Sequence, residues 1–163
     1  MVIRNELTSD YRNVEEMIKK AFWNLSVPGC NEHYFAHQVR KSDDYIPELD
    51  FVLEEDGKII GHIIYVKAKL VTEDGTEKEI ISFGPFTIHP DYQRKGYGRK
   101  LLEHSFDEAR KLGYDTVAIW GNPENYACYG FEEFDSTFPQ MEKGYKYTQE
   151  LFYIYSRSNV LRE

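Results

Sequence analysis

The feature that most constrains how this chain folds is a short glycine-containing segment, Gln93–Gly98 (QRKGYG). An extended apolar run, Ile81–Pro90, precedes it, and a pattern typical of a helix begins at Arg99. Two glycines let the backbone turn sharply and present N–H groups without a Cβ in the way. Because the N-terminus of a helix favours negative charge, this junction is suited to a phosphorylated ligand.

The side chains around the glycines support the same interpretation. Four cations and no acid lie between Gln93 and Leu102, although the chain carries a formal net charge of −8. These cations are Arg94, Lys95, Arg99 and Lys100. The spacing excludes a nucleoside-triphosphate loop, G-x-x-x-x-G-K-[ST], and Leu101 replaces the third glycine of a dinucleotide fingerprint.

A second segment follows after one predicted helix and one predicted strand. Trp120–Phe131 reads WGNPENYACYGF. Together, Q-x-x-G-x-G and Y-x-x-x-G-F resemble the two conserved segments of the GNAT superfamily of acyl-CoA-dependent N-acetyltransferases. The resemblance covers Ile80–Phe134, and G-N-P-x-x-Y leading into G-F resembles a subgroup known only as predicted N-acetyltransferases. Two departures are Gln93, where arginine is common, and the short gap between Asn122 and Tyr126.

The resemblance implies acetyl-CoA as co-substrate and a role for each matching residue. The glycine loop would cradle the pyrophosphate, and the preceding strand would carry the pantetheine arm. The cofactor-binding residues implied are Phe86, Thr87, Ile88, Gln93, Arg94, Lys95, Gly96, Tyr97, Gly98, Arg99 and Asn122. Tyr126 matches the tyrosine that protonates the departing thiolate in similar enzymes, with Tyr129 as its rival.

Gly84-Pro85 gives a physical reason for the pantetheine site. Proline cannot donate to a ladder and glycine tolerates a bulge, so we expect this central strand to be interrupted there. The backbone of Phe86–Ile88 would then be open to an amide-bearing ligand, and its N–H groups could stabilise an oxyanion. The alternative is an edge strand with a turn at Gly84-Pro85.

The general base is not identified by any motif. The candidates by chemistry alone are Glu32, Glu54, Glu55, His62 and His89. A loop-entry role is the simpler interpretation of His89, which precedes Pro90. Cys128 could accept an acyl group, but no His/Asp pattern accompanies it, so we favour a buried small hydrophobic residue.

Hydrophobic periodicity and turn signals place the remaining elements. The helices expected are Asp10–Asn24, Glu32–Lys41 and Arg99–Leu112. The strands expected are Val2–Leu7, Phe51–Glu54, Ile59–Val71, Glu79–Ile88, Thr116–Ile119 and Tyr147–Tyr155. The order predicts one α/β (α+β) domain over residues 1–163. Its mixed, mostly antiparallel central sheet would have splayed central strands and helices on both faces. The strands before and after the long helix would pair in parallel, because that helix makes the crossover between them.

Composition limits the partners. Hydrophobic residues make up 41% and charged residues 29%, as in an ordinary soluble domain. The negative charge argues against a nucleic acid and favours a cationic amine. No run is long enough for a membrane span, and Cys30 and Cys128 form neither a disulfide framework nor a metal knuckle. We therefore expect a cytoplasmic protein without a metal, and leave a homodimer open.

Three functions fit the sequence. The leading hypothesis is transfer of an acetyl group from acetyl-CoA directly to a primary amine of a small molecule or peptide. The alternatives are a non-catalytic CoA-binding module or sensor, and a protein N-acetyltransferase. We expect Asn31–Leu49 and the aromatic-rich Phe138–Tyr155 to line the acceptor site, whose ligand the sequence does not name.

Overall fold

The structure is a computed structural model and describes residues 1–25, 28–71, 74–120, 126–134 and 152–156. The chain divides into two compact units. The first contains Met1–Val66 and Phe83–Leu112, and the second contains Lys67–Ser82 and Gly113–Glu163. The strands β3 (Lys58–Val71) and β4 (Glu77–Ile88) contribute to both units.

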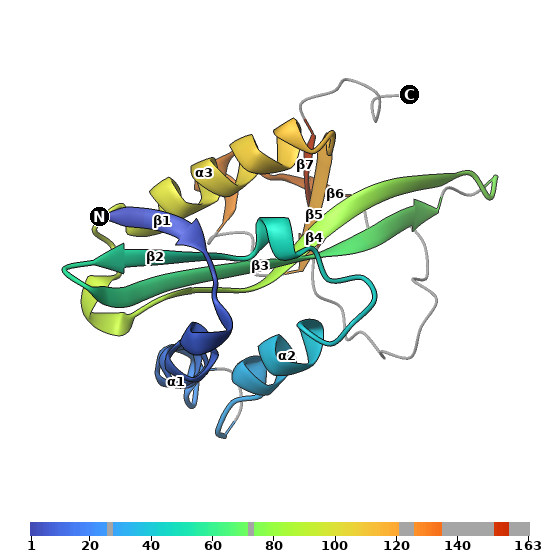
Figure 1. The fold of residues 1–163 in the computed structure, drawn as a ribbon. Coiled ribbons are helices and arrows are strands. Elements are labelled where there is room, and N and C mark those ends of the chain that lie inside the picture. The colour runs from blue at the N-terminus through green and yellow to red at the C-terminus, as the bar shows by residue number, and fades with distance from the viewer. Residues whose placement is uncertain (26–27, 72–73, 121–125, 135–151, 157–163) are drawn as a thin grey trace. The chain divides into compact units, whose positions relative to one another are not determined.

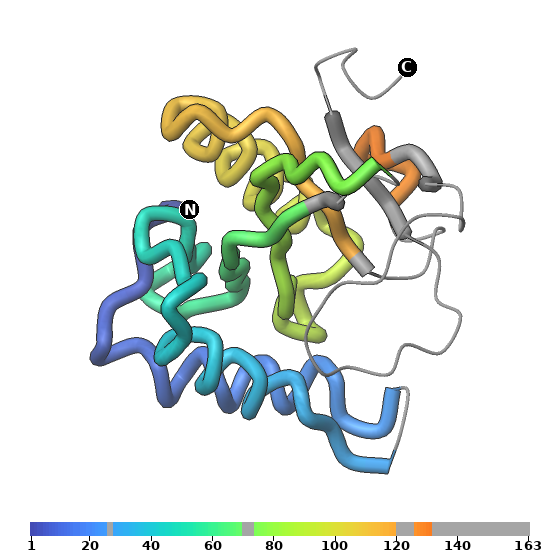
Figure 2. Tube along the Cα trace, turned by 90° about the vertical axis from the view of Figure 1, so that its right-hand side faces the viewer, coloured from blue at the N-terminus to red at the C-terminus, as the bar shows by residue number. Residues whose placement is uncertain are grey.

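Three helices belong to the first unit. Helices α1 (Tyr11–Phe22) and α2 (Glu32–Val39) lie side by side on one face of its strands, and α3 (Tyr97–Lys111) lies on the opposite face (Figures 1 and 2). The helices expected from the sequence are confirmed, with ends that differ by up to two residues. The apolar stripe of α1 packs inward, but Leu25 is exposed because the helix has already ended.

Strands β1 (Val2–Asn5) and β2 (Phe51–Glu55) complete the sheet of the first unit, in the order β1-β2-β3-β4. The pairs β1–β2 and β2–β3 are antiparallel. The turn between β2 and β3 places Asp56 and Gly57 at φ 50° and 72°. Two consecutive positive φ values are the requirement of the tight hairpin turn that Asp-Gly predicts.

The alignment of β3 with β4 is fixed by two contacts. The His89 N–H donates to the Ile60 carbonyl at 2.8 Å. A Cβ added at Gly61 would lie 2.9 Å from Ile88 Cδ1 and 3.2 Å from Leu53 Cβ, so Gly61 lies close to the Ile88 side chain. Ile60 therefore lies opposite His89 and Gly61 opposite Ile88. Continuing this antiparallel register by one residue places His62 opposite Thr87.

The two faces of the sheet in the first unit have different neighbours. On the face of α1 and α2, Val52 packs with Val14, Ile18 and Ala36 in a buried apolar cluster. On the α3 face, the buried hydroxyl of Tyr65 lies 2.7 Å from that of Ser105. Among the helices that the structure describes, none is long and apolar enough to cross a membrane.

The second unit contains the order β4-β5-β7-β6, with β5 (Thr116–Trp120), β6 (Glu132–Phe134) and β7 (Phe152–Ser156). Strand β4 pairs with β5 in parallel, with Ile81 opposite Val117 and Ser82 opposite Ala118. The predicted parallel pair is thus confirmed. Strand β7 is antiparallel to both β5 and β6. The sequence did not predict β6, and the first five residues of the expected strand 147–155 lie outside the described residues.

Strand β4 corrects one expectation. It runs as one strand through Gly84–Pro85, whose peptide bond is cis. The prediction that the strand is interrupted there is therefore wrong. Pro85 still brings no N–H donor to the ladder. The mixed, mostly antiparallel fold is confirmed, and the splay of the central strands stays a prediction.

Candidate active site

The glycine loop forms a sharp turn at the N-terminus of α3. Gly96 is the N-cap residue, with φ 84°, and Arg94 also adopts a left-handed conformation, with φ 59°. The first N–H groups of a helix have no partner within the helix. Left-handed residues next to such groups turn backbone N–H donors toward a common side, which is the geometry of an anion-binding nest. The backbone here is suited to a phosphate group.

Two side chains of the loop brace its own backbone. The Gln93 side-chain amide donates to the Ile88 carbonyl at 3.0 Å, and Lys95 Nζ donates to the Asp91 carbonyl at 2.8 Å. His89 Nδ1 accepts a hydrogen bond from the Asp91 N–H at 3.3 Å, at the start of a 3-10 helix over Pro90–Tyr92. His89 therefore has the loop-entry role that its position before proline predicted.

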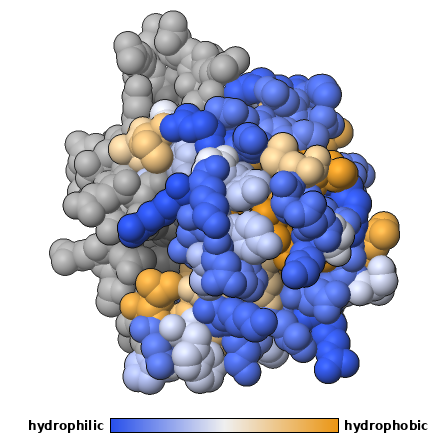
Figure 3. Space-filling model, turned by 90° about the vertical axis from the view of Figure 1, so that its left-hand side faces the viewer, coloured by the Kyte–Doolittle hydropathy of each residue, from blue (hydrophilic) through white to orange (hydrophobic). Residues whose placement is uncertain are grey.

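Aromatic rings add to this bracing. Tyr92 makes edge-on contacts with both His89 and Tyr97, at centroid distances of 5.8 and 6.0 Å, and Lys95 Nζ lies 5.5 Å from the Tyr92 ring. Arg94 is exposed, and Arg99 is exposed with Glu103 at 3.8 Å. Among the described residues, hydrophilic ones cover most of the face shown in Figure 3.

The three residues predicted to carry the pantetheine arm end β4. Phe86 is half-buried and contacts Phe83 edge-on, and Ile88 is half-buried against Gly61. Thr87 is 2% exposed, and its hydroxyl has no hydrogen-bond partner among the described residues. The structure thus brings residues 86–88 and the loop together in the first unit. Asn122 lies outside the described residues.

Tyr126 belongs to the second unit and is described within it. It precedes a 3-10 helix over Ala127–Tyr129, is half-buried, and its ring lies 5.8 Å from that of Phe131. Burial raises the pKa of Tyr126, and Tyr129 adds to the shift. Its hydroxyl is therefore protonated near neutrality. Cys128 is exposed, so the expectation that it is a buried small residue is wrong.

Three of the candidate bases are half-buried, and each makes a local contact. Glu54 accepts from Arg4 at 2.9 Å, and Glu55 lies 2.8 Å from the terminal amino group of Met1. Glu32 accepts from the neighbouring Asn31 N–H at 2.9 Å. These contacts give each carboxylate a local structural role.

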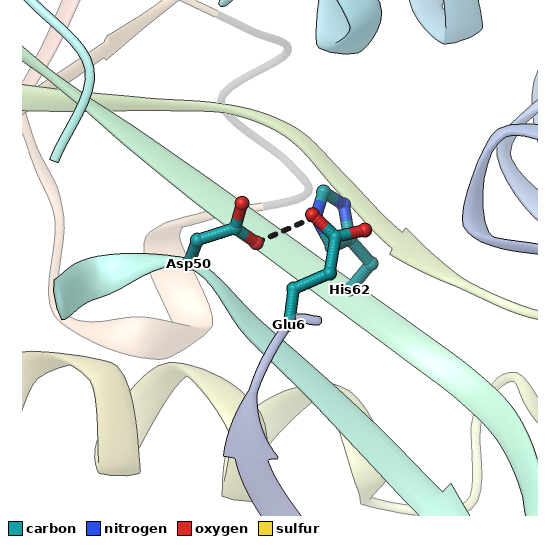
Figure 4. Close-up of side chains that lie close together, drawn as sticks. All are labelled: Glu6, Asp50 and His62. Carbon is teal, nitrogen blue, oxygen red and sulfur yellow. Dashed lines mark hydrogen bonds and ion pairs between the residues drawn. The ribbon is translucent and has the colours of Figure 1, made fainter. Parts of the chain in front are cut away.

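The fourth candidate, His62, lies in a buried polar cluster. Glu6 follows β1, Asp50 precedes β2, and His62 lies on β3, with their side chains pointing toward one another (Figure 4). The His62 Nε2 atom is 2.9 Å from Asp50 Oδ1 and 3.8 Å from Glu6 Oε2. Tyr45 donates to Asp50 Oδ2 at 2.7 Å. Arg40 donates to both oxygens of Glu6, at 2.8 and 2.9 Å.

These contacts set the charges of the cluster. Burial opposes the imidazolium, but the hydrogen bonds and charges of Asp50 and Glu6 outweigh it and raise the pKa of His62. Burial works against the Asp50 carboxylate too, but the hydrogen bond with His62 leads the contacts that lower its pKa. Burial raises the pKa of Glu6 despite its contacts with His62 and Arg40.

The same three residues are of types that can bind a metal ion. Glu6, Asp50 and His62 each offer one atom within 4.8 Å of the others. However, Arg40 occupies both oxygens of Glu6, and His62 and Tyr45 occupy those of Asp50. The donor set fits a network of hydrogen bonds and ion pairs better than a metal centre. Sequence reasoning missed this cluster because its members are far apart in the chain.

Comparison with known proteins assigns the family. The model of the acetyltransferase (GNAT) family matches residues 14–133. The chain belongs to the GNAT acetyltransferase family. It is 31% identical over 125 residues to an uncharacterized N-acetyltransferase, YjhQ, of Escherichia coli K12, covering 76% of this chain and 65% of the relative. It is 34% identical over 85 residues to the ribosomal protein bS18-alanine N-acetyltransferase of the same organism. That match covers 52% of this chain and 51% of the relative.

Solved structures show the same fold. A GNAT acetyltransferase from Brucella melitensis in complex with acetyl-CoA gives a TM-score of 0.72 at 24% identity, covering 96% of this chain and 88% of the other. YhbS from Escherichia coli in complex with CoA gives a TM-score of 0.73 at 20% identity. That match covers 95% of this chain and 80% of the other. The match spans less than two thirds of the length of both sequence relatives named above.

Proposed function

We propose that this protein is an acetyl-CoA-dependent N-acetyltransferase that transfers the acetyl group directly to a primary amine. The observation that carries the proposal is the loop of residues 93–98. Left-handed residues and the start of α3 present its N–H donors, and the loop lies within residues 14–133, which the family model matches. In this proposal the loop binds the pyrophosphate, and the backbone of residues 86–88 binds the pantetheine arm.

In this proposal Tyr126 is the general acid of the reaction. The neutral amine attacks the thioester carbonyl, and backbone N–H groups of residues 86–88 stabilise the oxyanion. The C–S bond then breaks, and the Tyr126 hydroxyl donates its proton to the departing thiolate. The nitrogen loses one proton to solvent as the amide forms, and the Tyr126 phenolate regains one from solvent. The raised pKa of Tyr126 supports this role, because the group stays protonated until it is used.

The proposed acceptor is a small molecule or a peptide. The net charge of −8 favours a cationic amine by electrostatic steering. Similarity to an enzyme named as a ribosomal protein bS18-alanine N-acetyltransferase favours a protein as the second candidate acceptor. A CoA-binding sensor is the non-catalytic alternative. We further propose one catalytic domain over residues 1–163, acting in the cytoplasm as a monomer or homodimer, with no metal in the reaction.

Tyr126→Phe tests the assignment. It keeps the ring and removes only the proton donor, so kcat should fall about 10²-fold, the low end for general acid–base catalysis. The KM for acetyl-CoA should change little. Free-thiol release from acetyl-CoA measures both constants, with spermidine and a basic peptide beginning with alanine as acceptors.

Tyr129→Phe is the matched control and should retain kcat. A fully active Tyr126→Phe alongside an inactive Tyr129→Phe would mean that the other tyrosine is the acid. Tight CoA binding by calorimetry without transfer to any amine in a broad panel would favour the sensor.

A further inference from the structure

A cysteine and two histidines lie close together at the start of α2. Cys30 precedes the N-cap residue of the helix, and His33 and His37 lie four positions apart within it. Residues at this spacing are neighbours on a helix, with Cβ atoms about 5–6 Å apart. Thiolate and imidazole are the groups that bind zinc in proteins. The spacing C-x-x-H-x-x-x-H therefore brings together three side chains of the types that bind zinc.

Contacts with α1 show that these side chains lie along the interface between the two helices, which run side by side (Figures 1 and 2). Cys30 Sγ is 3.8 Å from the Lys19 carbonyl oxygen, and His37 Nδ1 is 3.0 Å from Glu15 Oε1. Glu15 and Lys19 are one turn apart on α1, as His33 and His37 are on α2. Cys30 and His37, the two ends of the group, are therefore both directed toward α1.

Cys30 and His33 already have the separation of two ligands of one zinc ion. The Sγ atom of Cys30 lies 3.4 Å from Nδ1 of His33. Zinc–sulfur and zinc–nitrogen bonds of about 2.3 and 2.0–2.1 Å, at a tetrahedral angle, place the two ligand atoms about 3.5 Å apart. The observed separation is close to that value, so both atoms can bind one ion with little movement.

His37 is held by a carboxylate, as metal-binding histidines usually are. Its Nδ1 faces Glu15 Oε1, and a carboxylate only accepts, so Nδ1 carries the proton of the neutral ring and Nε2 the lone pair. Among the described residues, no hydrogen bond occupies Nε2. A ligating histidine almost always donates its other ring N–H to such a partner. Helical side chains also lean toward the N-terminus, which carries the His37 ring over the turn of His33.

All three side chains are accessible to an ion from solvent. Cys30 and His33 are half-buried, and the His37 side chain is 45% exposed. Partial burial raises the pKa of the Cys30 thiol, and the charge of Glu32 adds to the shift while that of Lys19 opposes it. The thiol is therefore protonated near neutrality. A bound zinc ion would replace this proton, because the thiolate is the form that ligates metals.

We propose that Cys30, His33 and His37 form a zinc-binding site at the start of α2, beside α1. The site is independent of the proposed function, in which no metal takes part. Cys30 Sγ and His33 Nδ1 bind the ion where they stand, and the His37 side chain turns to bring Nε2 to it. Water takes the fourth tetrahedral position, and the thiol proton passes to solvent. Glu15 acts through His37 as a positioning residue.

Cobalt(II) is the first probe, because it occupies zinc sites and its absorption spectrum reports a sulfur ligand. With the full chain in a phosphine reductant, we expect one Co²⁺ per chain to give a thiolate-to-metal charge-transfer band. Added Zn²⁺ should remove the band, because zinc binds such sites more tightly than cobalt. Cys30→Ser should abolish the band. Cys128→Ser is the matched control at an exposed cysteine and should retain it.

Zinc affinity, measured by competition with a chromophoric chelator, is the second test. Glu15→Gln should keep the cobalt band and lower the zinc affinity about tenfold, the effect of losing a partner that orients a ligating histidine. His33→Gln and His37→Gln should lower the affinity further, because each removes a ligand. His104→Gln, on α3, is the matched control and should bind zinc normally. An unchanged affinity in Glu15→Gln would overturn its positioning role.

A band that persists in Cys128→Ser supports the site even if another variant fails to fold, because the chain has only two cysteines. No band in the wild type with excess Co²⁺, or the same band in Cys30→Ser, overturns the site and leaves a hydrogen bond between the thiol and His33. Unchanged zinc affinity in both histidine variants overturns it too. Acetyl transfer is assayed separately with chelator present, so failure of the proposed function is distinguishable from failure of the zinc site.

Discussion

Two polar regions of the first unit, the loop of residues 89–98 and the cluster around His62, contrast in almost every physical respect. The bracing contacts of the loop join residues at most five positions apart, and its cations are exposed. The cluster joins positions 6, 40, 50 and 62 in a buried environment. The loop is built by local sequence, whereas the cluster exists only once β1, β2, β3 and α2 have assembled.

The difference predicts different energetics. Exposed charges are screened by salt and contribute little to stability individually. A buried ion pair is costly to break, because the remaining charge keeps its desolvation penalty without its partner. Substitution of a charged residue in the loop should therefore leave folding stability unchanged and weaken ligand binding. Substitution of a charged residue in the cluster should lower folding stability.

The largest effect is expected from Arg40→Met. This change leaves Glu6 buried without its bidentate partner, so the free energy of unfolding should fall by about 3–5 kcal/mol. The loss should be smaller at pH 5 than at pH 8. Burial raises the pKa of Glu6 in the folded state, and removing Arg40 raises it further, so the stability of the variant falls as pH rises through that value. Denaturant unfolding at both pH values measures this.

Arg12→Met is the matched control, because Arg12 is exposed and its ion pair with Glu16, at 3.4 Å, is exposed too. It should change stability by less than about 0.5 kcal/mol. If Arg40→Met were equally mild, the energetic contrast between buried and exposed charges would not hold in this chain.

Gly98→Val should have an intermediate effect, on binding and not on folding. Gly98 lies in the first turn of α3, and a β-branched side chain there would keep a ligand from the backbone. We expect CoA affinity to fall about tenfold, or about 1.4 kcal/mol, by calorimetry. Glu103→Val places the same side chain further along α3 and should bind CoA normally. Equal affinities for both variants would remove the loop from the site.

Arg94→Glu should have the smallest effect. Its side chain is exposed, so reversal of charge should weaken CoA binding several-fold at low salt and less at 0.5 M salt. Calorimetry at two salt concentrations measures the difference. An effect independent of salt would indicate that the left-handed backbone at this position, not its charge, governs binding.

Local patterns predicted the fold well, and the reasons are physical. Asp56-Gly57 specified the hairpin because both residues tolerate positive φ, and the stripe of Val14, Met17 and Ile18 specified α1. Gly84-Pro85 misled, because a strand can keep its extended form through proline when no donor is required. Strand β6, of three residues, is too short for any periodicity to appear.

In the candidate site too, local features could be predicted from the sequence and long-range contacts could not. The loop and the role of His89 followed from neighbouring residues. The contact of His62 with Asp50 could not be predicted, because it depends on the register of β3 against β2. Cys128 was misjudged because composition alone cannot distinguish a buried thiol from an exposed one.

The bracing of the loop has a kinetic consequence. Gln93, Lys95 and Tyr92 hold residues 89–97 in place through contacts within the chain itself. A ligand that meets an already ordered loop does not have to immobilise it, which removes one cost of association. Encounter should then be fast and similar for related acyl-CoA molecules. How long each one resides, set by its dissociation rate, should decide which of them the protein retains.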